Sequence, residues 1–211
     1  MITEASNMHT LESSFPQRVV ILFLAANPST TTRLRLDSEV RAIDQALRQA
    51  NYRDQFDLRQ HWAVRVADLQ ELLLRHQPHI VHFSGHGASS GEILLQDDAG
   101  RAQAVPPQAL ANVFSLLIDN IRCVVLNACF SQTQAVTIAQ HVDCVVGMSQ
   151  EIGDKDARAF AAAFYEALAY GKSVKTAFEL GRNRIDLAGL EDGEVPQLLC
   201  PNSDPAIVTF A

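Results

Sequence analysis

The chain has 211 residues, 24 acidic and 17 basic, and a formal net charge of −7. That length suits one α/β domain. The negative charge argues against nucleic acid as the main partner, because phosphate binding needs a clustered basic surface. No apolar run approaches the ~20 residues of a membrane span, and residues 1–17 lack the pattern of a secretory signal. We therefore predict a flexible leader over 1–17, a single domain over 18–211, and no membrane partner.

The four cysteines are Cys123, Cys129, Cys144 and Cys200, and no two of them have C-x-x-C spacing. Cys123 and Cys144 lie inside apolar runs, where a cysteine usually acts as a small buried hydrophobic residue. This usage predicts a reduced, cytoplasmic setting.

The first half of the chain alternates between apolar runs and helical spacing. A buried strand is predicted at 18–25, bounded by proline on both sides. Apolar residues three and four apart then predict a helix over 36–47. A strand at 56–64, a helix at 66–76 ended by a proline, and a second buried strand at 79–84 follow.

The second half continues this alternation. A small hairpin is predicted over 92–100, with Asp97 and Asp98 in its turn rather than in a metal site. A helix beginning at two prolines precedes a third buried strand at 123–128. A helix at 133–141 and a fourth buried strand at 143–148 come next.

The last part of the chain is predicted to form two helices and a short edge strand. The first helix spans 154–170, with Asp154 as a possible cap and Gly171 at its end. The second spans 173–185, and the edge strand lies in the proline-punctuated tail. Buried strands that alternate with amphipathic helices predict an α/β fold, with a mostly parallel sheet covered by helices on both faces.

Two of the predicted buried strands end in reactive residues, His86 and Cys129. Functional groups gather at the carboxyl ends of parallel strands, so these two would meet if their strands are neighbours. A free thiol is weakly ionised at neutral pH and needs a base, which His86 could supply. Gly85 and Gly87 are predicted to let the chain turn sharply at His86. The backbone N–H groups of Gly87 and Cys129 could form an oxyanion hole.

The segments His82-Phe-Ser-Gly-His-Gly87 and Val125-Leu-Asn-Ala-Cys-Phe-Ser131 resemble the CHAT peptidase family, which is related to caspases, gingipains and separase. The His-to-Cys separation is close to the spacing of about 50 of the caspase signature. The resemblance implies a three-layer caspase-like sandwich and a cysteine endopeptidase with a Cys129–His86 dyad. It also implies a protein or peptide substrate and no cofactor. CHAT domains generally serve as the proteolytic output of bacterial sensing or defence systems, which implies control by a regulatory partner or an oligomer.

The preference at P1, the substrate residue before the scissile bond, stays open between two hypotheses. Asp154 and Asp156 could neutralise a basic P1 residue, and an acidic rim favours this option. Alternatively, Arg33 or Arg35 could bind an acidic P1 residue, as the corresponding loop does in caspases. Asn127 stands where metacaspases, by resemblance, carry an acid that helps to bind a basic P1 residue.

Two other functions compete with peptidase activity. One is a non-catalytic CHAT-like regulatory or interaction module, which the intact dyad argues against. The other is a nucleotide-sensing α/β domain, but neither a Walker A nor a G-x-G-x-x-G turn follows the first strand. His79, His82 and His86 do not have a known metal-ligand spacing, so no metal site is predicted.

Overall fold

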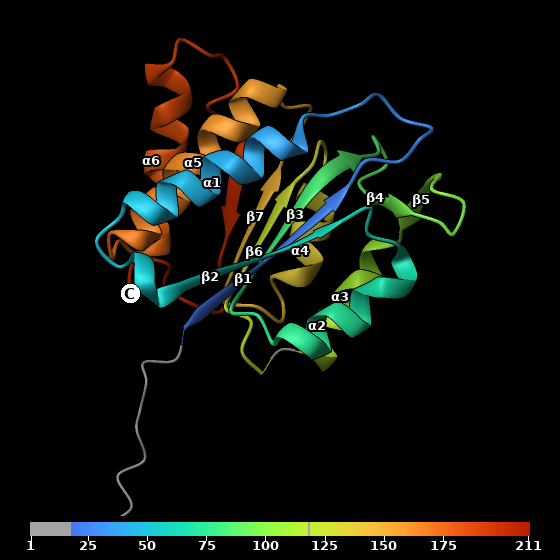
Figure 1. Cartoon of the computed structure of the whole chain (residues 1–211), viewed down its shortest axis with the longest axis horizontal. Helices are drawn as coiled ribbons and strands as arrows, with labels where there is room; N and C mark the ends of the chain where they lie inside the picture. Colours follow the sequence, from blue (N-terminus) through green and yellow to red (C-terminus); the bar gives the residue numbers. More distant parts are fainter. Residues whose placement is uncertain (1–17, 118) are drawn as a thin grey trace, which may run out of the picture.

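The computed structural model describes residues 18–117 and 119–211, and the predicted leader over 1–17 lies outside them. A central sheet runs through the molecule in the order β2-β1-β3-β6-β7-β8 (Figure 1). The first five strands are parallel and β8 is antiparallel to β7. Their bounds are β1 Val19–Ala26, β2 Phe56–Trp62, β3 Ile80–Gly87, β6 Cys123–Asn127, β7 Cys144–Met148 and β8 Pro196–Leu199.

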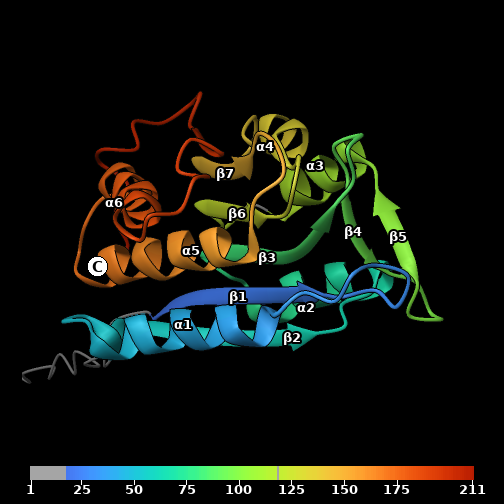
Figure 2. The same cartoon turned by 90° about the horizontal axis from the view of Figure 1, so that it is seen from above.

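Helices cover both faces of this sheet (Figures 1 and 2). On one face lie α1 (Leu36–Gln49), α5 (Asp154–Ala169) and α6 (Val174–Leu187). On the other lie α2 (Leu69–His76), α3 (Pro107–Leu116) and α4 (Gln132–Ile138). Two short 3-10 helices, Arg53–Gln55 and Val66–Asp68, precede β2 and α2. The predicted three-layer α/β sandwich is confirmed.

Each of the two faces has its own apolar core, because side chains alternate across a strand. In β1, Ile21 and Phe23 pack with α1 and α5, whereas Leu22 and Leu24 pack on the opposite face. All four are at most 2% exposed. Burial on both faces explains why this strand is a continuous apolar run in the sequence rather than an alternating one.

A hairpin formed by β4 (Ile93–Gln96) and β5 (Ala102–Val105) extends the end of β3. The Asp97 carboxylate accepts the backbone N–H groups of Ala99 and Arg101, each at 2.8 Å, and so shapes the turn. The prediction of turn chemistry at Asp97 is confirmed. The hairpin is fastened to α4 by Gln134, whose side chain accepts from Ile93 N–H and donates to the Val105 carbonyl oxygen.

Two local predictions were wrong. The strand β3 does not end at Ser84 but continues through His86 to Gly87, so the chain makes no sharp turn at the histidine. Asp154 does not cap α5, since Gly153 occupies the N-cap position and no side chain caps this helix within the described residues. Asp154 is instead the first helical residue, where a negative charge interacts favourably with the helix dipole. No helix in residues 18–117 or 119–211 has both the length and the apolar character needed to cross a membrane.

Candidate active site

His86 is the next-to-last residue of β3, and its ring is held by the connection between β1 and α1. Its Nε2 atom lies 2.6 Å from the carbonyl oxygen of Thr32. A carbonyl oxygen can only accept a hydrogen bond, so Nε2 carries the proton in this contact. In the neutral imidazole, Nδ1 is then the basic nitrogen. Thr32 therefore selects the ring atom that can receive a proton.

Cys129 reaches the same edge of the sheet from the neighbouring strand. The pairing of β3 with β6 ends at Ser84 and Asn127, each two residues before the reactive side chain. Cys129 is half-buried, and its Sγ lies 4.0 Å from the carbonyl oxygen of Ile152. The two strands are neighbours, which was the condition for His86 and Cys129 to meet at one edge. His86 and Cys129 line one small pocket of about 50 Å³.

The backbone after Cys129 makes an abrupt strand-to-helix transition. Phe130 has a φ of 56°, in the left-handed region that non-glycine residues seldom adopt. Its N–H donates to the carbonyl oxygen of Gln150 at 3.2 Å. Ser131 is fully buried, donates to the Leu126 carbonyl oxygen at 2.9 Å and accepts from Met148 N–H at 3.0 Å. These bonds tie the turn to both β6 and β7 and fix the position of the cysteine.

The glycines beside His86 are required by close packing rather than by a turn. A Cβ atom on Gly85 would lie 2.6 Å from the carbonyl oxygen of Ala26, and one on Gly87 would lie 1.8 Å from that of Cys129. Any side chain at either position would push neighbouring strands apart. The strand ends can therefore approach each other only because both residues are glycine.

The N–H of Gly87 is turned away from the hairpin. Ala88 N–H donates to the carbonyl oxygen of Glu92, whereas Ile93 N–H donates to the Gln134 side chain. Hydrogen-bonded and non-hydrogen-bonded pairs alternate along an antiparallel ladder, so Gly87 and Ile93 form a non-hydrogen-bonded pair. The N–H of Gly87 is therefore not used by β4.

A buried carboxylate, missed by the sequence analysis, forms part of the same pocket. Glu39 in α1 is 5% exposed and lines the pocket with Ser84 and Asn127. Its Oε1 accepts from His82 Nε2 at 2.8 Å and from Asn127 Nδ2 at 2.6 Å, and its Oε2 accepts from Ser84 Oγ at 2.5 Å. The other ring nitrogen of His82, Nδ1, lies 3.0 Å from the hydroxyl of Tyr165. The sequence did carry a signal for this carboxylate, because Glu39 is a charged residue within the apolar stripe of α1.

The residues predicted to select the substrate are divided among different places. Asp154 is exposed and lines the pocket, and Asn127 lies buried in it. Asp156 is buried and accepts from Asp192 N–H at 3.3 Å, outside the pocket lining. Arg33 lines an adjoining cavity of about 280 Å³ that shares Leu34 and Leu36 with this pocket, and exposed Arg35 lines neither of the two.

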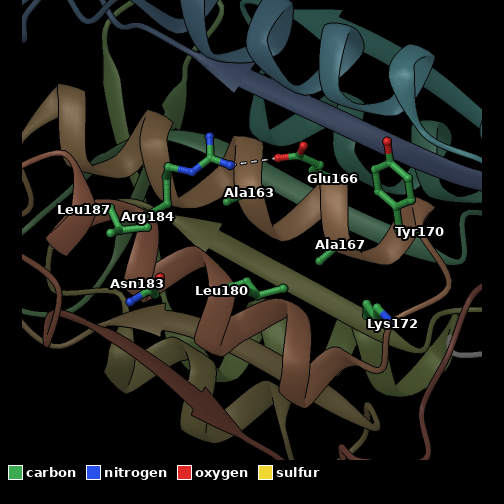
Figure 3. Close-up of a pocket in the computed structure, with 9 residues that line it drawn as sticks. All are labelled: Ala163, Glu166, Ala167, Tyr170, Lys172, Leu180, Asn183, Arg184 and Leu187. Atoms are coloured by element: carbon green, nitrogen blue, oxygen red, sulfur yellow. Dashed lines mark hydrogen bonds and ion pairs between the residues drawn. The ribbon is translucent and has the colours of Figure 1, made fainter.

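A larger groove of about 300 Å³ lies elsewhere, between α5 and α6 (Figure 3). Its walls are mainly apolar, and Arg184 pairs with Glu166 across it at 3.0 Å. Neither His86 nor Cys129 lines this groove. Within the described residues no three His, Cys, Asp or Glu side chains are grouped so that they could hold a metal ion.

Solved structures with similar folds include two cysteine proteinases. The Arg-specific cysteine proteinase gingipain R matches with a TM-score of 0.62 at 11% identity, covering 90% of this chain and 47% of its own. Caspase-1 from Spodoptera frugiperda matches with a TM-score of 0.57 at 11% identity, covering 92% and 90%. At this identity the likeness establishes the fold, which is caspase-like.

Two curated proteins are related in sequence. A Roc-COR-CHAT protease from an unknown prokaryotic organism is 26% identical over 161 residues, covering 73% of this chain and 15% of that protein. A probable protease from Gillisia limnaea is 23% identical over 157 residues, covering 72% of this chain and 27% of that protein. The chain thus spans at most about a quarter of these relatives' length. The family model of the CHAT domain matches residues 3–188, and the chain therefore belongs to the CHAT domain family.

Proposed function

We propose that this chain is a cysteine endopeptidase in which Cys129 is the nucleophile and His86 is the general acid–base. The observation that carries the proposal is the placement of both side chains in one pocket at the ends of adjacent parallel strands, with Nε2 of His86 held by the Thr32 carbonyl. A nucleophile, a base and a group that orients the base are the parts that activated thiols require.

The proposed reaction passes through an acyl-enzyme. Sγ of Cys129 attacks the carbonyl carbon of the scissile peptide bond, and its proton passes to Nδ1 of His86. His86 returns this proton to the departing amine as the C–N bond breaks, leaving a thioester on Cys129. A water molecule, deprotonated by His86, then attacks the thioester carbonyl carbon; the C–S bond breaks, the new carboxyl terminus is released, and His86 returns the proton to Sγ of Cys129.

We place the developing negative charge of the tetrahedral intermediates against the N–H groups of Gly87 and Cys129. The N–H of Gly87 points away from the hairpin, and Cys129 lies beyond the last residue of β6. Loss of one such donor costs about 3–4 kcal/mol of transition-state stabilisation in other enzymes.

The names of the relatives support a protein substrate. Both curated relatives are called proteases and are several times longer than this chain. We propose in addition that a regulatory partner or an oligomer controls this activity, and that the chain acts as the proteolytic output of a bacterial sensing or defence system in the cytoplasm.

Cleavage of a peptide library that contains every P1 residue tests the mechanism. We expect the unaltered chain to cleave, and Cys129→Ala and His86→Ala each to abolish cleavage while keeping the circular dichroism of the parent. Cys200→Ser is the matched control, since Cys200 is half-buried but lies outside the pocket. Cleavage that persists in Cys129→Ala would exclude the proposed mechanism, and an inactive chain would favour a non-catalytic module.

A further inference from the structure

The pocket beside Cys129 contains a buried carboxylate that keeps an open acceptor site. A carboxylate offers about four lone pairs, and Glu39 uses three of them for His82, Asn127 and Ser84. Two of these donors share Oε1, so Oε2 bonds only to Ser84. The remaining acceptor site belongs to an oxygen of a residue that lines the pocket.

A second residue of the pocket lining, Asn127, has a buried acceptor without a partner. Asn127 is 5% exposed, and its Oδ1 makes no hydrogen bond within the described residues. The orientation of this amide is fixed, because its Nδ2 donates to Glu39 at 2.6 Å and a reversed amide would set two acceptor oxygens against each other. Buried polar atoms are nearly always paired, so an isolated acceptor indicates that a donor belongs there.

Apart from His86, which gains and loses a proton in the proposed reaction, the charged residues of the pocket lining are all acidic. Glu39 and Asp154 both line it, and the described residues contribute no lysine or arginine to it. Glu39 is held by an imidazole, an amide and a hydroxyl, and a buried carboxylate with such partners is stabilised further by a cation. A P1 aspartate, by contrast, would bring a second negative charge towards Glu39. It would also offer the unpaired Oδ1 of Asn127 another acceptor rather than a donor.

We propose that this pocket binds a positively charged P1 side chain, lysine or arginine, with Glu39 and Asn127 accepting hydrogen bonds from its terminal group. The inference rests on the proposed peptidase function, of which it names the substrate class. The free volume of about 50 Å³ suits a compact terminal group, since one water takes up about 30 Å³. The Leu34, Leu36 and Ile152 side chains supply apolar surface for the methylene stem of such a residue.

The assignment can be tested by binding, without any need for catalysis. Peptides that differ only in their C-terminal residue would be titrated into the full chain carrying Cys129→Ala, with the side-chain amide of Asn127 followed by NMR. We expect peptides ending in arginine or lysine to bind about tenfold more tightly, or better, than those ending in citrulline, norleucine or aspartate. Citrulline is the decisive comparison, because it keeps the shape of arginine without its charge.

Variants then assign the preference to Glu39. Glu39→Gln is expected to abolish the preference for arginine over citrulline, and Asp154→Asn at the rim to reduce it less. Glu166→Gln is the matched control, because Glu166 lines the groove between α5 and α6 instead, and it should keep the full preference. If Glu39→Gln does not fold, the comparison of arginine with citrulline peptides and the Asp154→Asn variant still show whether the pocket prefers a positive charge.

Equal binding of arginine and citrulline peptides, a preference that survives Glu39→Gln, or the absence of binding by any peptide would each overturn the inference. Cleavage by the unaltered chain after neutral or acidic residues would overturn it while leaving the peptidase proposal intact. If the chain prefers basic peptides in binding but cleaves no substrate, the inference about P1 stands and the peptidase proposal fails.

Discussion

The carbonyl oxygen of Cys129 occupies the space where a side chain on Gly87 would stand, since a Cβ built there would lie 1.8 Å from it. Two segments that are distant in the sequence therefore meet backbone to backbone at the proposed catalytic edge. The position of the nucleophile relative to β3 depends on this contact, because atoms at 1.8 Å must separate.

Gly87→Ala is therefore expected to displace Cys129 and to lower kcat/KM by about a hundredfold or more, since catalytic groups tolerate little misplacement. Thermal denaturation would accompany the kinetics, because the same clash also lowers the melting temperature. Gly189→Ala is the control for the kinetics: its positive φ also makes alanine destabilising, but a Cβ there meets nothing within 4 Å. Wild-type activity in Gly87→Ala would contradict the close approach.

Ser131→Ala removes the hydroxyl that joins β6 to β7. The substitution leaves the buried N–H of Met148 without its acceptor, which costs about 1–3 kcal/mol of unfolding free energy. Urea denaturation would measure this loss. Ser90→Ala, at an exposed loop position, should change the free energy by less than about 0.5 kcal/mol. Equal effects of the two substitutions would argue against the bridging role of Ser131.

Native-state alkylation should divide the four cysteines into two classes. Burial raises the pKa of the Cys123 thiol, and a hydrogen bond given to Cys200 together with burial raises that of Cys144. The pKa of Cys200 is lowered, because the Cys144 thiol donates a hydrogen bond to its sulfur. Cys129 and Cys200 are half-buried whereas Cys123 and Cys144 are buried, so iodoacetamide should modify the first two and spare the others.

Intact-mass spectrometry would follow this reaction. Cys200→Ser should leave a single fast modification, which peptide mapping would place at Cys129. Fast modification of Cys123 or Cys144 in the folded chain would contradict their burial. The Cys200→Ser background also removes the competing thiol when the reactivity of the nucleophile is measured.

The stability of the fold should decrease as the pH falls from about 7.5 to 5. Burial, and to a lesser extent Arg122, holds the pKa of His79 below its unfolded value of about 6.5, and its Nδ1 accepts from Val20 N–H at 3.1 Å. The unfolded chain therefore takes up the proton more readily, and the stabilisation present above pH 6.5 is lost below it. His76, whose pKa burial also lowers, acts in the same direction.

Urea denaturation at several pH values would measure this effect. His79→Gln should make the curve flatter between pH 7.5 and 5, because the side chain that titrates is gone. A wild-type stability that stays constant over this interval would contradict the assigned direction of the histidine pKa values.

The main elements could be predicted because their signals are local. Continuous apolar runs marked β1, β3, β6 and β7, and these strands are buried on both faces. Helical spacing of Leu36, Val40, Ile43 and Leu47 marked α1, and all four are buried. The rule that functional groups gather at the carboxyl ends of parallel strands was then enough to bring His86 and Cys129 to one edge.

The predictions that failed concerned contacts between distant segments. From the sequence, Gly85 and Gly87 were assigned the conformational role usual for glycine, whereas their neighbours Ala26 and Cys129 make them necessary for close packing. It likewise offered Asp154 as a cap, although the backbone places that residue one position inside the helix.

The sequence by itself thus determined the layered fold and the positions of the two proposed catalytic side chains at strand ends, because hydrophobic periodicity and strand ends are properties of short segments. Only the tertiary structure decided what surrounds them. Thr32 reaches His86, and Glu39 reaches Asn127, by hydrogen bonds between residues many positions apart. Such contacts depend on how helices and loops dock on the sheet, and no local pattern of residues encodes that docking.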